Sequence, residues 1–258
     1  MYPSDLRDAQ WVRLEPLLKE PRGERHAGGR PRTYELRRVV DAMLYVVKTG
    51  CQWRQMPANF PALAVGASAV PCVARQRSVG ARGQGTARAG PQGAGTKRRA
   101  HRGDPRFSVG EDGPKRGRRG YDAGKKIKGR KRHIALDTQG HLLAVVVHSA
   151  GIQDRVAARA VLMRLFCRFD TIPTVFADGG YTGKLIDWAK EMFGYKVKVV
   201  KRKEQPLFQV LPKRWIVERT LAWLNWSRRL SKDYELRHTS AETIIHIAFA
   251  HLLLRRST

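Results

Sequence analysis

The sequence of 258 residues predicts an α/β fold with a mixed sheet, preceded by a small helical domain. Apolar, β-branched runs at 133–137 and 141–148 flank a Gly-containing turn, which is typical of a hairpin. The segments after them alternate between helical and strand periodicity, as in a sheet with flanking helices. At the other end of the chain, residues 4–19 and 34–48 have apolar residues at helical spacing.

The N-terminal segment predicts two short helices joined by a basic loop. Residues 4–19 begin at Ser4, a residue type that caps helices well, and residues 34–48 end before Gly50, as helices often do. Two short helices with an Arg-rich loop fit a helix-turn-helix DNA reader, and they fit any small helical domain equally well. On the first reading, the loop supplies two candidate DNA-binding residues, Arg30 and Arg32.

The charge of the chain favours nucleic acid as its partner. Lys and Arg number 50 against 22 Asp and Glu, which gives a formal net charge of +28. Lys and Arg neutralise phosphates, the main source of non-specific nucleic-acid affinity. A membrane surface could also use this charge, but no run is long enough to span a bilayer and no signal peptide is recognisable. Three scattered cysteines argue against a disulfide framework or zinc site and favour a reducing, cytoplasmic setting.

Residues 61–105 differ from the rest in composition. They contain no Phe, Trp, Tyr, Ile or Met, and Ala, Gly, Arg and Pro dominate. One interpretation is a basic disordered linker, because such a stretch has too little apolar surface to fold. The other is a GC-rich gene translated out of frame, because GC-rich codons encode these four residues.

From Gly120 the pattern becomes that of a folded domain. Residues 120–132 are predicted to form a basic, glycine-rich loop. Its candidate phosphate-binding residues are Lys125, Lys126, Lys128, Arg130, Lys131 and Arg132. After the hairpin, the periodicity predicts helices at 154–169, 185–193, 212–230 and 242–255 and strands at 174–178 and 195–200.

Two carboxylates are the candidates for chemistry. Asp178 ends an apolar strand and precedes two glycines, a place where α/β sheets carry ligand groups, although it could instead cap the helix at Lys184. Glu218 stands alone among basic residues of the helix 212–230, where it could pair with Arg214 one turn away. Together, two carboxylates in a basic domain could hold Mg²⁺ for phosphoryl transfer on DNA, but such a site needs a third.

Several motifs resemble the DDE transposases of bacterial insertion sequences. They are Gly120-Tyr-Asp-Ala-Gly-Lys-Lys, Gly129-Arg-Lys-Arg-His, Ala177-Asp-Gly-Gly-Tyr and Leu211-Pro-Lys-Arg-Trp-Ile-Val-Glu-Arg-Thr. Leu6-Arg-Asp-Ala-Gln-Trp and Thr49-Gly-Cys-Gln-Trp-Arg resemble the small helical domain of the same family. The resemblance covers roughly residues 1–60 and 119–258.

This resemblance implies an RNase H-like fold that cuts and joins DNA at transposon ends. Asp178 matches the second catalytic Asp and Glu218 the catalytic Glu, both as ligands of Mg²⁺ or Mn²⁺. Arg214 matches a residue expected to contact DNA beside them. Water activated by the metal would cut the DNA end, and the freed 3′-hydroxyl would attack the target. One departure from the family is Trp226, which stands where an Arg is usual.

The first catalytic Asp of the family has no counterpart. The family carries it in Asp-Ser-x-Ser-Val-Lys-Thr, where this chain has Arg106-Phe-Ser-Val-Gly-Glu-Asp-Gly113. A coding sequence CGA TTC AGT GTC GGT GAA GAC GG, read one nucleotide later, gives Asp-Ser-Val-Ser-Val-Lys-Thr. Pro61-Ala-Leu-Ala-Val-Gly can be shifted to Pro-Trp-Gln-Ser-Val in the same way. We therefore hypothesise two compensating frameshifts around residues 61–118, which the nucleotide sequence of the gene would test.

These observations predict three segments: a helical DNA-binding domain at 1–60, a poorly ordered segment at 61–118, and an RNase H-like domain at 119–258 lacking its first strand. The expected protein is an insertion-sequence transposase with weak metal binding and defective cleavage; the alternative is a dead DNA-binding remnant. Its expected partners are transposon ends and target DNA, with a homodimer left open. We expect a cytoplasmic, nucleoid-associated protein. Asp137, Asp104 and Asp112 are poor substitutes for the missing Asp.

Overall fold

The computed structural model describes residues 2–18, 34–61, 104–112, 119–124, 126–169, 171–200 and 214–256. For residues 104–112, Ile127 and Arg214 it describes the backbone only. The chain forms two compact units. The first comprises residues 1–87, 226–231 and 243–258, and the second comprises residues 88–225 and 232–242.

The first unit is helical, as predicted. It contains α1 (Asp8–Leu18), α2 (Leu36–Thr49), the 3-10 helices Trp53–Gln55 and Arg228–Leu230, and most of α7 (His238–Arg256). Helix α2 ends as its sequence indicates: Gly50 has φ 72°, and its N–H donates to Val46 O. Such a positive φ favours glycine. Helix α1 begins at Asp8 rather than at Ser4, which is buried.

C-terminal residues complete this first unit. The Gln10 side chain donates to Leu254 O at 3.1 Å, and the Arg229 guanidinium donates to Cys51 O at 3.1 Å. The predicted helical domain ended at residue 60, whereas the compact unit around α1 and α2 also includes residues 226–231 and 243–258. None of the helices in the described part of the chain is long and apolar enough to cross a membrane.

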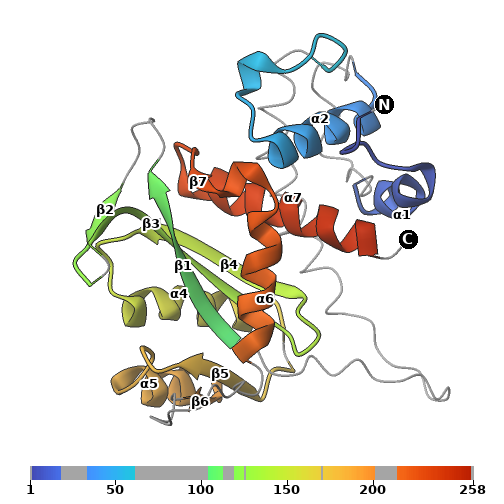
Figure 1. Ribbon diagram of the computed structural model, residues 1–258. Coiled ribbons are helices and arrows are strands. Elements are labelled where there is room, and N and C mark those ends of the chain that lie inside the picture. Colours follow the sequence, from blue (N-terminus) through green and yellow to red (C-terminus); the bar gives the residue numbers. More distant parts are fainter. Residues whose placement is uncertain are drawn as a thin grey trace, which may run out of the picture. The chain divides into compact units, whose positions relative to one another are not determined.

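The second unit is built on a mixed sheet (Figure 1). Its central strand, β3 (Ile127–Leu136), pairs antiparallel with β1, β2 and β4, and β1 pairs in parallel with β7. The predicted hairpin is therefore confirmed, with Gly140 at φ 89° in its turn. The other strands of this sheet are β1 (Asp104–Asp112), β2 (Gly120–Asp122), β4 (Leu142–Ser149) and β7 (Lys232–Asp233).

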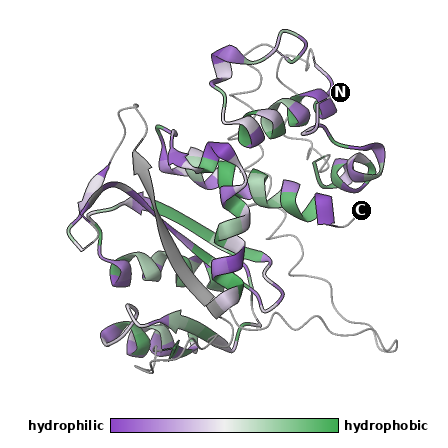
Figure 2. Ribbon diagram, in the orientation of Figure 1, coloured by the Kyte–Doolittle hydropathy of each residue, from purple (hydrophilic) through white to green (hydrophobic). Residues whose placement is uncertain are grey.

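The two faces of β3 have different partners because side chains alternate along a strand. Ala135 belongs to a core cluster with Val161 and Leu165 of α4 (Asp154–Phe166). Arg130 and Arg132, on the opposite face, contact residues 232–236. Figure 1 shows α4 and α6 (Arg214–Asn225) on opposite sides of the sheet. In Figure 2 the hydrophobic colouring of β4 matches its burial between neighbouring elements.

A second pair of strands extends the core. Strands β5 (Thr174–Asp178) and β6 (Lys196–Val200) are parallel and are connected by α5 (Lys184–Phe193). Val175, Ala177 and Tyr181 join the cluster that α4 forms with the main sheet. Asp178 is therefore held at the end of a strand whose inner face is fully packed.

Two predicted segments differ from the structure. The expected helix at 212–230 is shorter: α6 ends at Asn225, and Ser227 is extended at φ −90° and ψ 103°. Residues 226–231, which follow the end of α6, belong to the first compact unit. Residues 201–213 lie outside the described part of the chain.

Strand β1 corrects the prediction that the domain lacks its first strand. Residues 104–112 pair along β3, with Arg106 opposite Ile134 and Glu111 opposite Gly129. Main-chain hydrogen bonds require an extended backbone and do not depend on particular side chains, so a segment of this composition can still pair along β3. The rest of the predicted poorly ordered segment, residues 62–103 and 113–118, lies outside the described residues.

Candidate active site and nucleic-acid interface

Asp178 lies in an open turn at the carboxyl end of β5. The Gly179 N–H donates to Asp178 Oδ1 at 2.7 Å, and the Tyr181 N–H donates to Asp178 O at 3.0 Å. A Cβ built on Gly179 or Gly180 would have no atom within 4 Å, so the turn has room around it. Helix α5 has no side-chain hydrogen bond at its N-cap, Gly183. Asp178 therefore stands at the end of β5 in a turn with open space around its glycines, and its role as a metal ligand stays a prediction.

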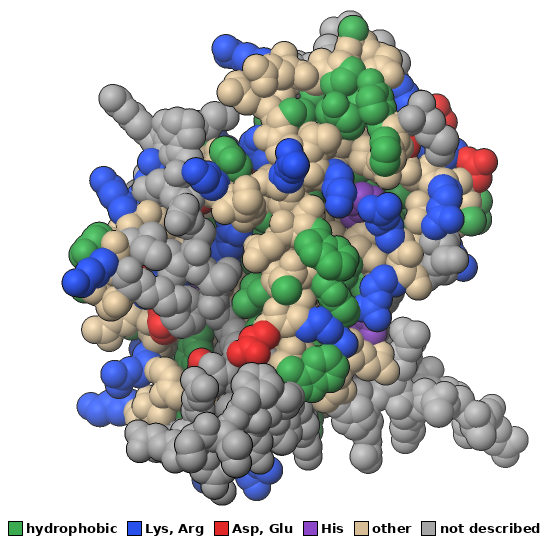
Figure 3. Space-filling model, viewed as in Figure 1, with side chains coloured by type: hydrophobic (Ala, Val, Ile, Leu, Met, Phe, Trp, Pro, Cys, Tyr) green, Lys and Arg blue, Asp and Glu red, His purple; other side chains and the backbone are tan. Residues whose placement is uncertain are grey.

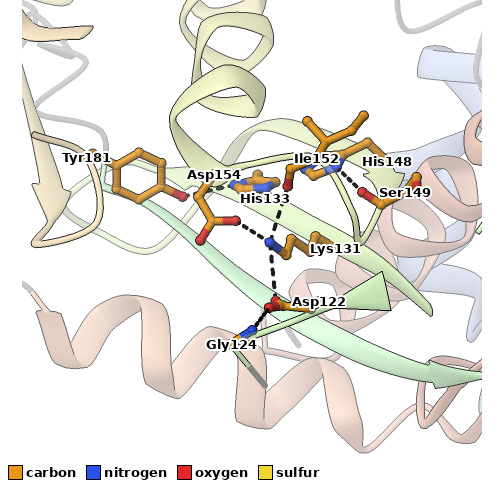
Figure 4. Close-up of polar contacts among 9 residues, drawn as sticks. All are labelled: Asp122, Gly124, Lys131, His133, His148, Ser149, Ile152, Asp154 and Tyr181. Carbon is orange, nitrogen blue, oxygen red and sulfur yellow. Dashed lines mark hydrogen bonds and ion pairs between the residues drawn. The ribbon is translucent and has the colours of Figure 1, made fainter. Parts of the chain in front are cut away.

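Tyr181 anchors this turn to the sheet (Figure 4). Its side chain is only 1% exposed, and its hydroxyl lies 2.9 Å from His133 Nδ1. The ring of His133 stacks on His148 at a centroid distance of 4.7 Å. Burial, followed by the charges of His148 and Lys131, lowers the pKa of His133 to about 3. The His133 imidazole is therefore neutral at neutral pH, and its contact with the Tyr181 hydroxyl holds the turn that follows Asp178.

Lys131 lies on the same face of β3 as His133 and is buried in an ion-pair network (Figure 4). Its Nζ lies 3.2 Å from Asp122 Oδ2 and 2.9 Å from Asp154 Oδ1, and it donates to Ile152 O at 3.2 Å. Burial lowers the pKa of Lys131, but the hydrogen bonds that its ammonium donates to the two carboxylates, together with their negative charges, outweigh this effect and raise the pKa overall. The network ties β2 and the start of α4 to β3.

Arg130 and Arg132 occupy the opposite face of β3. The Arg130 side chain is 1% exposed; its Nε lies 3.1 Å from Asp233 Oδ2, and it donates to Glu235 O at 2.6 Å and to Leu236 O at 3.1 Å. Arg132 donates to Lys232 O at 3.3 Å, and burial lowers its pKa. Both guanidinium groups are therefore used to hold the chain that follows α6 against the sheet.

The predicted DNA-binding role of Arg130, Lys131 and Arg132 is thus wrong. Residues 127–132 belong to β3, the central strand, rather than to a surface loop, so these side chains are buried and their charges are met within the protein. Lys126 and Lys128 are exposed and stay candidates for phosphate contact. Three other predicted contacts, Lys125, Arg30 and Arg32, lie outside the described residues, and the side chain of Arg214 is not described.

Glu218 lies on the exposed side of α6. Its neighbours Val217, Thr220 and Leu224 are buried, and the Thr220 hydroxyl donates to Ile216 O at 2.8 Å. This inner side contacts β1 and β3. Figure 3 shows hydrophobic, basic and acidic side chains exposed next to one another over α6. The Glu218 carboxylate is therefore presented to solvent by a helix that is fixed to the sheet.

A Trp–Arg–Trp stack flanks Glu218 on α6. The Arg219 guanidinium carbon lies 4.4 Å from the ring centroids of both Trp215 and Trp223. Arg219 also donates to Gln139 O at 3.4 Å in the turn of the β3–β4 hairpin. This stack was not predicted, although the spacing i, i+4, i+8 in the sequence places the three residues along one side of a helix.

The three elements that should carry a catalytic triad are neighbours. Strand β1 contacts β3, β5 and α6, so the strand that should hold the first Asp lies next to the elements that hold Asp178 and Glu218. Strand β1 includes Arg106–Asp112, part of the stretch that, by the motif resemblance, stands in place of the family's Asp-Ser-x-Ser-Val-Lys-Thr. Among the described residues, no three His, Cys, Asp or Glu side chains are grouped closely enough to hold a metal ion.

Asp137 does not replace the missing carboxylate. It accepts hydrogen bonds from Gln139 N at 2.9 Å, His141 N at 2.8 Å and His141 Nδ1 at 2.8 Å. These contacts use both carboxylate oxygens to close the β3–β4 turn. Asp137 is therefore a turn residue whose carboxylate is used within the hairpin.

The mixed sheet with helices on both faces, Asp178 at a strand end and Glu218 on a helix beside β1 define an RNase H-like protein. Two family comparisons agree: a model described as "Transposase DDE domain" matches residues 92–253, and one described as "Putative transposase of IS4/5 family" matches residues 6–65. The chain belongs to the family of transposases with a DDE domain, which confirms the resemblance seen in its motifs.

A curated relative points to the same family. Over 138 residues the chain is 30% identical to the "Putative transposase for insertion sequence element IS402" from Burkholderia cepacia. The match covers 48% of this chain and 60% of that relative. The chain therefore spans less than two thirds of the relative that it matches.

Proposed function

We propose that this chain is an insertion-sequence transposase that binds DNA ends but is defective in cutting them. The observation that carries the proposal is the composition of β1. This strand contacts the elements that present Asp178 and Glu218, and its sequence places Arg106 where the family carries the first catalytic Asp. A cation at that position would repel a divalent metal ion instead of binding it.

The residues present do not fit a tightly held Mg²⁺ or Mn²⁺. In the family, such an ion supplies an activated oxygen nucleophile and stabilises the leaving oxygen. Asp178 and Glu218 offer two carboxylates, and the described part of the chain groups no third ligand with them. We expect any binding by this pair to be weak, because Mg²⁺ needs several oxygen ligands in fixed geometry.

DNA binding rests on parts of the chain that do not depend on the metal. The net charge of +28 favours phosphate contacts, and Lys126 and Lys128 are exposed beside β3. Arg214, which begins α6 one turn before Glu218, is the further contact that the resemblance implies. The helical first unit is the proposed reader of the terminal sequence, and target DNA is the second proposed substrate. A homodimer on DNA stays a prediction, which sedimentation of the DNA-bound chain would test.

A cleavage assay tests the proposal directly. The purified chain is incubated with labelled terminal DNA of its element and Mg²⁺ or Mn²⁺, next to its Asp178→Ala and Glu218→Gln variants. We expect all three to bind the DNA with similar affinity and none to cut it. Cleavage by the parent chain that Asp178→Ala abolishes would show that the site is functional, and failure to bind DNA at moderate salt would overturn the binding role.

The alternative function is that of a dead remnant that only occupies DNA. The defective transposase and the remnant are both expected to bind terminal DNA without cutting it. They differ in what a restored β1 does, because a remnant that has lost more than its first Asp would stay inactive after the strand is repaired.

A further inference from the structure

The Trp215–Arg219–Trp223 stack is built as a rigid exposed platform. Arg219 lies between the two rings at 4.4 Å from each centroid and is tied to Gln139 O of the hairpin turn. Trp215 is 44% exposed. Burial of a large aromatic side chain would normally stabilise the fold. The inner side of α6, with Val217 and Leu224, already fixes the helix to the sheet. The packing of α6 on the sheet therefore does not explain why a tryptophan stands at position 215.

The chemistry of this platform selects its ligand. Trp215 offers an indole face, and Arg219 behind it supplies a positive charge that stays in place because two rings and a carbonyl hold it. A flat, electron-rich group attached to a polyanion suits both features. Nucleobases meet this description, and the net charge of +28 favours contact with the phosphates that they carry.

Base pairing restricts which nucleobase can reach the platform. Bases inside a duplex are covered on both faces by their neighbours, and pairing holds a terminal base in the plane of its pair, so an unpaired base is the one that can turn its face to Trp215. Glu218 lies between Trp215 and Arg219 in sequence and is exposed on the same helix. A base on the platform would therefore belong to a DNA end close to Glu218.

We propose that Trp215, backed by Arg219 and Trp223, stacks an unpaired base at the DNA end beside Glu218. The inference rests on the proposed DNA binding and adds the recognition of a frayed or single-stranded terminus. Stacking on aromatic side chains is tolerant of sequence because every base has a π-face, so the preference should be for structure rather than for a particular base.

The test uses the full chain and two short duplexes that differ only at one end. One is blunt; the other ends in an unpaired 2-aminopurine, whose fluorescence falls when it stacks. We expect the parent chain to prefer the unpaired end by about tenfold and to quench the probe, in line with stacking energies for exposed bases. Trp215→Ala should abolish both effects, and Trp215→Phe should keep much of the quenching because the aromatic face is retained.

Phe166→Ala is the matched control. Phe166 is an exposed aromatic residue, at 48%, on α4, which lies on the other side of the sheet from α6. This variant should retain the preference and the quenching. Circular dichroism should be the same for all variants, so that loss of folding is detected separately.

The outcomes separate this inference from the proposed function. If the chain binds both duplexes equally, or if Trp215→Ala quenches 2-aminopurine as the parent does, the stacking role is wrong while DNA binding stands. If Trp215→Leu quenches as well as Trp215→Phe, apolar contact rather than an aromatic platform explains the signal, and the proposal fails. If neither duplex binds, the proposed function itself is contradicted.

Discussion

Replacing Arg130 with Met should strongly destabilise the second unit. The guanidinium is 1% exposed and faces Asp233, which is 3% exposed, at 3.1 Å. Its removal leaves the Asp233 carboxylate buried without this partner and also deletes the hydrogen bonds to Glu235 O and Leu236 O. Breaking one side of a buried ion pair costs about 3–5 kcal/mol, and we expect a loss of free energy of unfolding in that range.

Urea unfolding followed by circular dichroism measures this loss. With a slope of about 2 kcal/mol per M, the midpoint of the affected transition should fall by roughly 1.5–2.5 M. The double variant Arg130→Met with Asp233→Asn is the control, and it should recover part of the loss because the buried charge is neutralised. A parent-like midpoint for Arg130→Met, together with weaker DNA binding, would refute the burial of Arg130 and restore its predicted phosphate contact.

Three further predictions concern His133, Tyr181 and Lys128. Since the pKa of His133 falls from 6.5 to about 3 on folding, the unfolded chain binds the proton first as pH drops. The free energy of unfolding should therefore decrease by up to about 1.4 kcal/mol per pH unit below pH 6.5, and urea titrations of His133→Asn should show a shallower decrease. Tyr181→Phe should cost about 1–3 kcal/mol and speed hydrogen exchange in the Asp178 turn but not in β4; unchanged exchange would contradict the anchor. Lys128→Ala should lower by about 1 the slope of log affinity against log salt without altering the urea midpoint.

Local signals predicted much of the fold. The glycine after α2, the glycine turn of the β3–β4 hairpin and the apolar run before Asp178 each act within a few residues, so the sequence could indicate where these elements end. The apolar periodicity around Glu218 likewise predicted a helix, and α6 has Val217 and Leu224 buried on one side.

Burial of charge could not be predicted in the same way. Residues 127–132 are rich in Lys, Arg and Gly, a composition typical of a solvated loop, yet they form the centre of the sheet. Their partners are distant in sequence: Asp233 for Arg130, and Asp154 for Lys131. The sequence shows which residues are charged but not which of them pair in the folded chain. The prediction of a loop at 120–132 therefore failed, because contacts between distant residues place 127–132 in β3.

The formation of strand β1 could not be predicted from composition either. The composition of residues 61–118 predicted poor order throughout, but residues 104–112 pair with β3 through main-chain hydrogen bonds that any extended segment can make. Backbone pairing keeps the strand in place, while the catalytic side chain, on the frameshift hypothesis, depends on the reading frame. The fold and the chemistry of this strand are therefore separable, and this separation allows a direct repair.

Restoring β1 tests the central claim most directly. Residues 106–112 are replaced by Asp-Ser-Val-Ser-Val-Lys-Thr, alone and with the frame-corrected sequence of 61–118, and Mg²⁺-dependent cleavage of terminal DNA is measured next to the same replacement with Ala in place of the Asp. We predict cleavage with the Asp, none with the Ala, and none by the parent chain. A parent chain that cuts DNA, or restored chains that bind the ends and never cut them, would contradict the account.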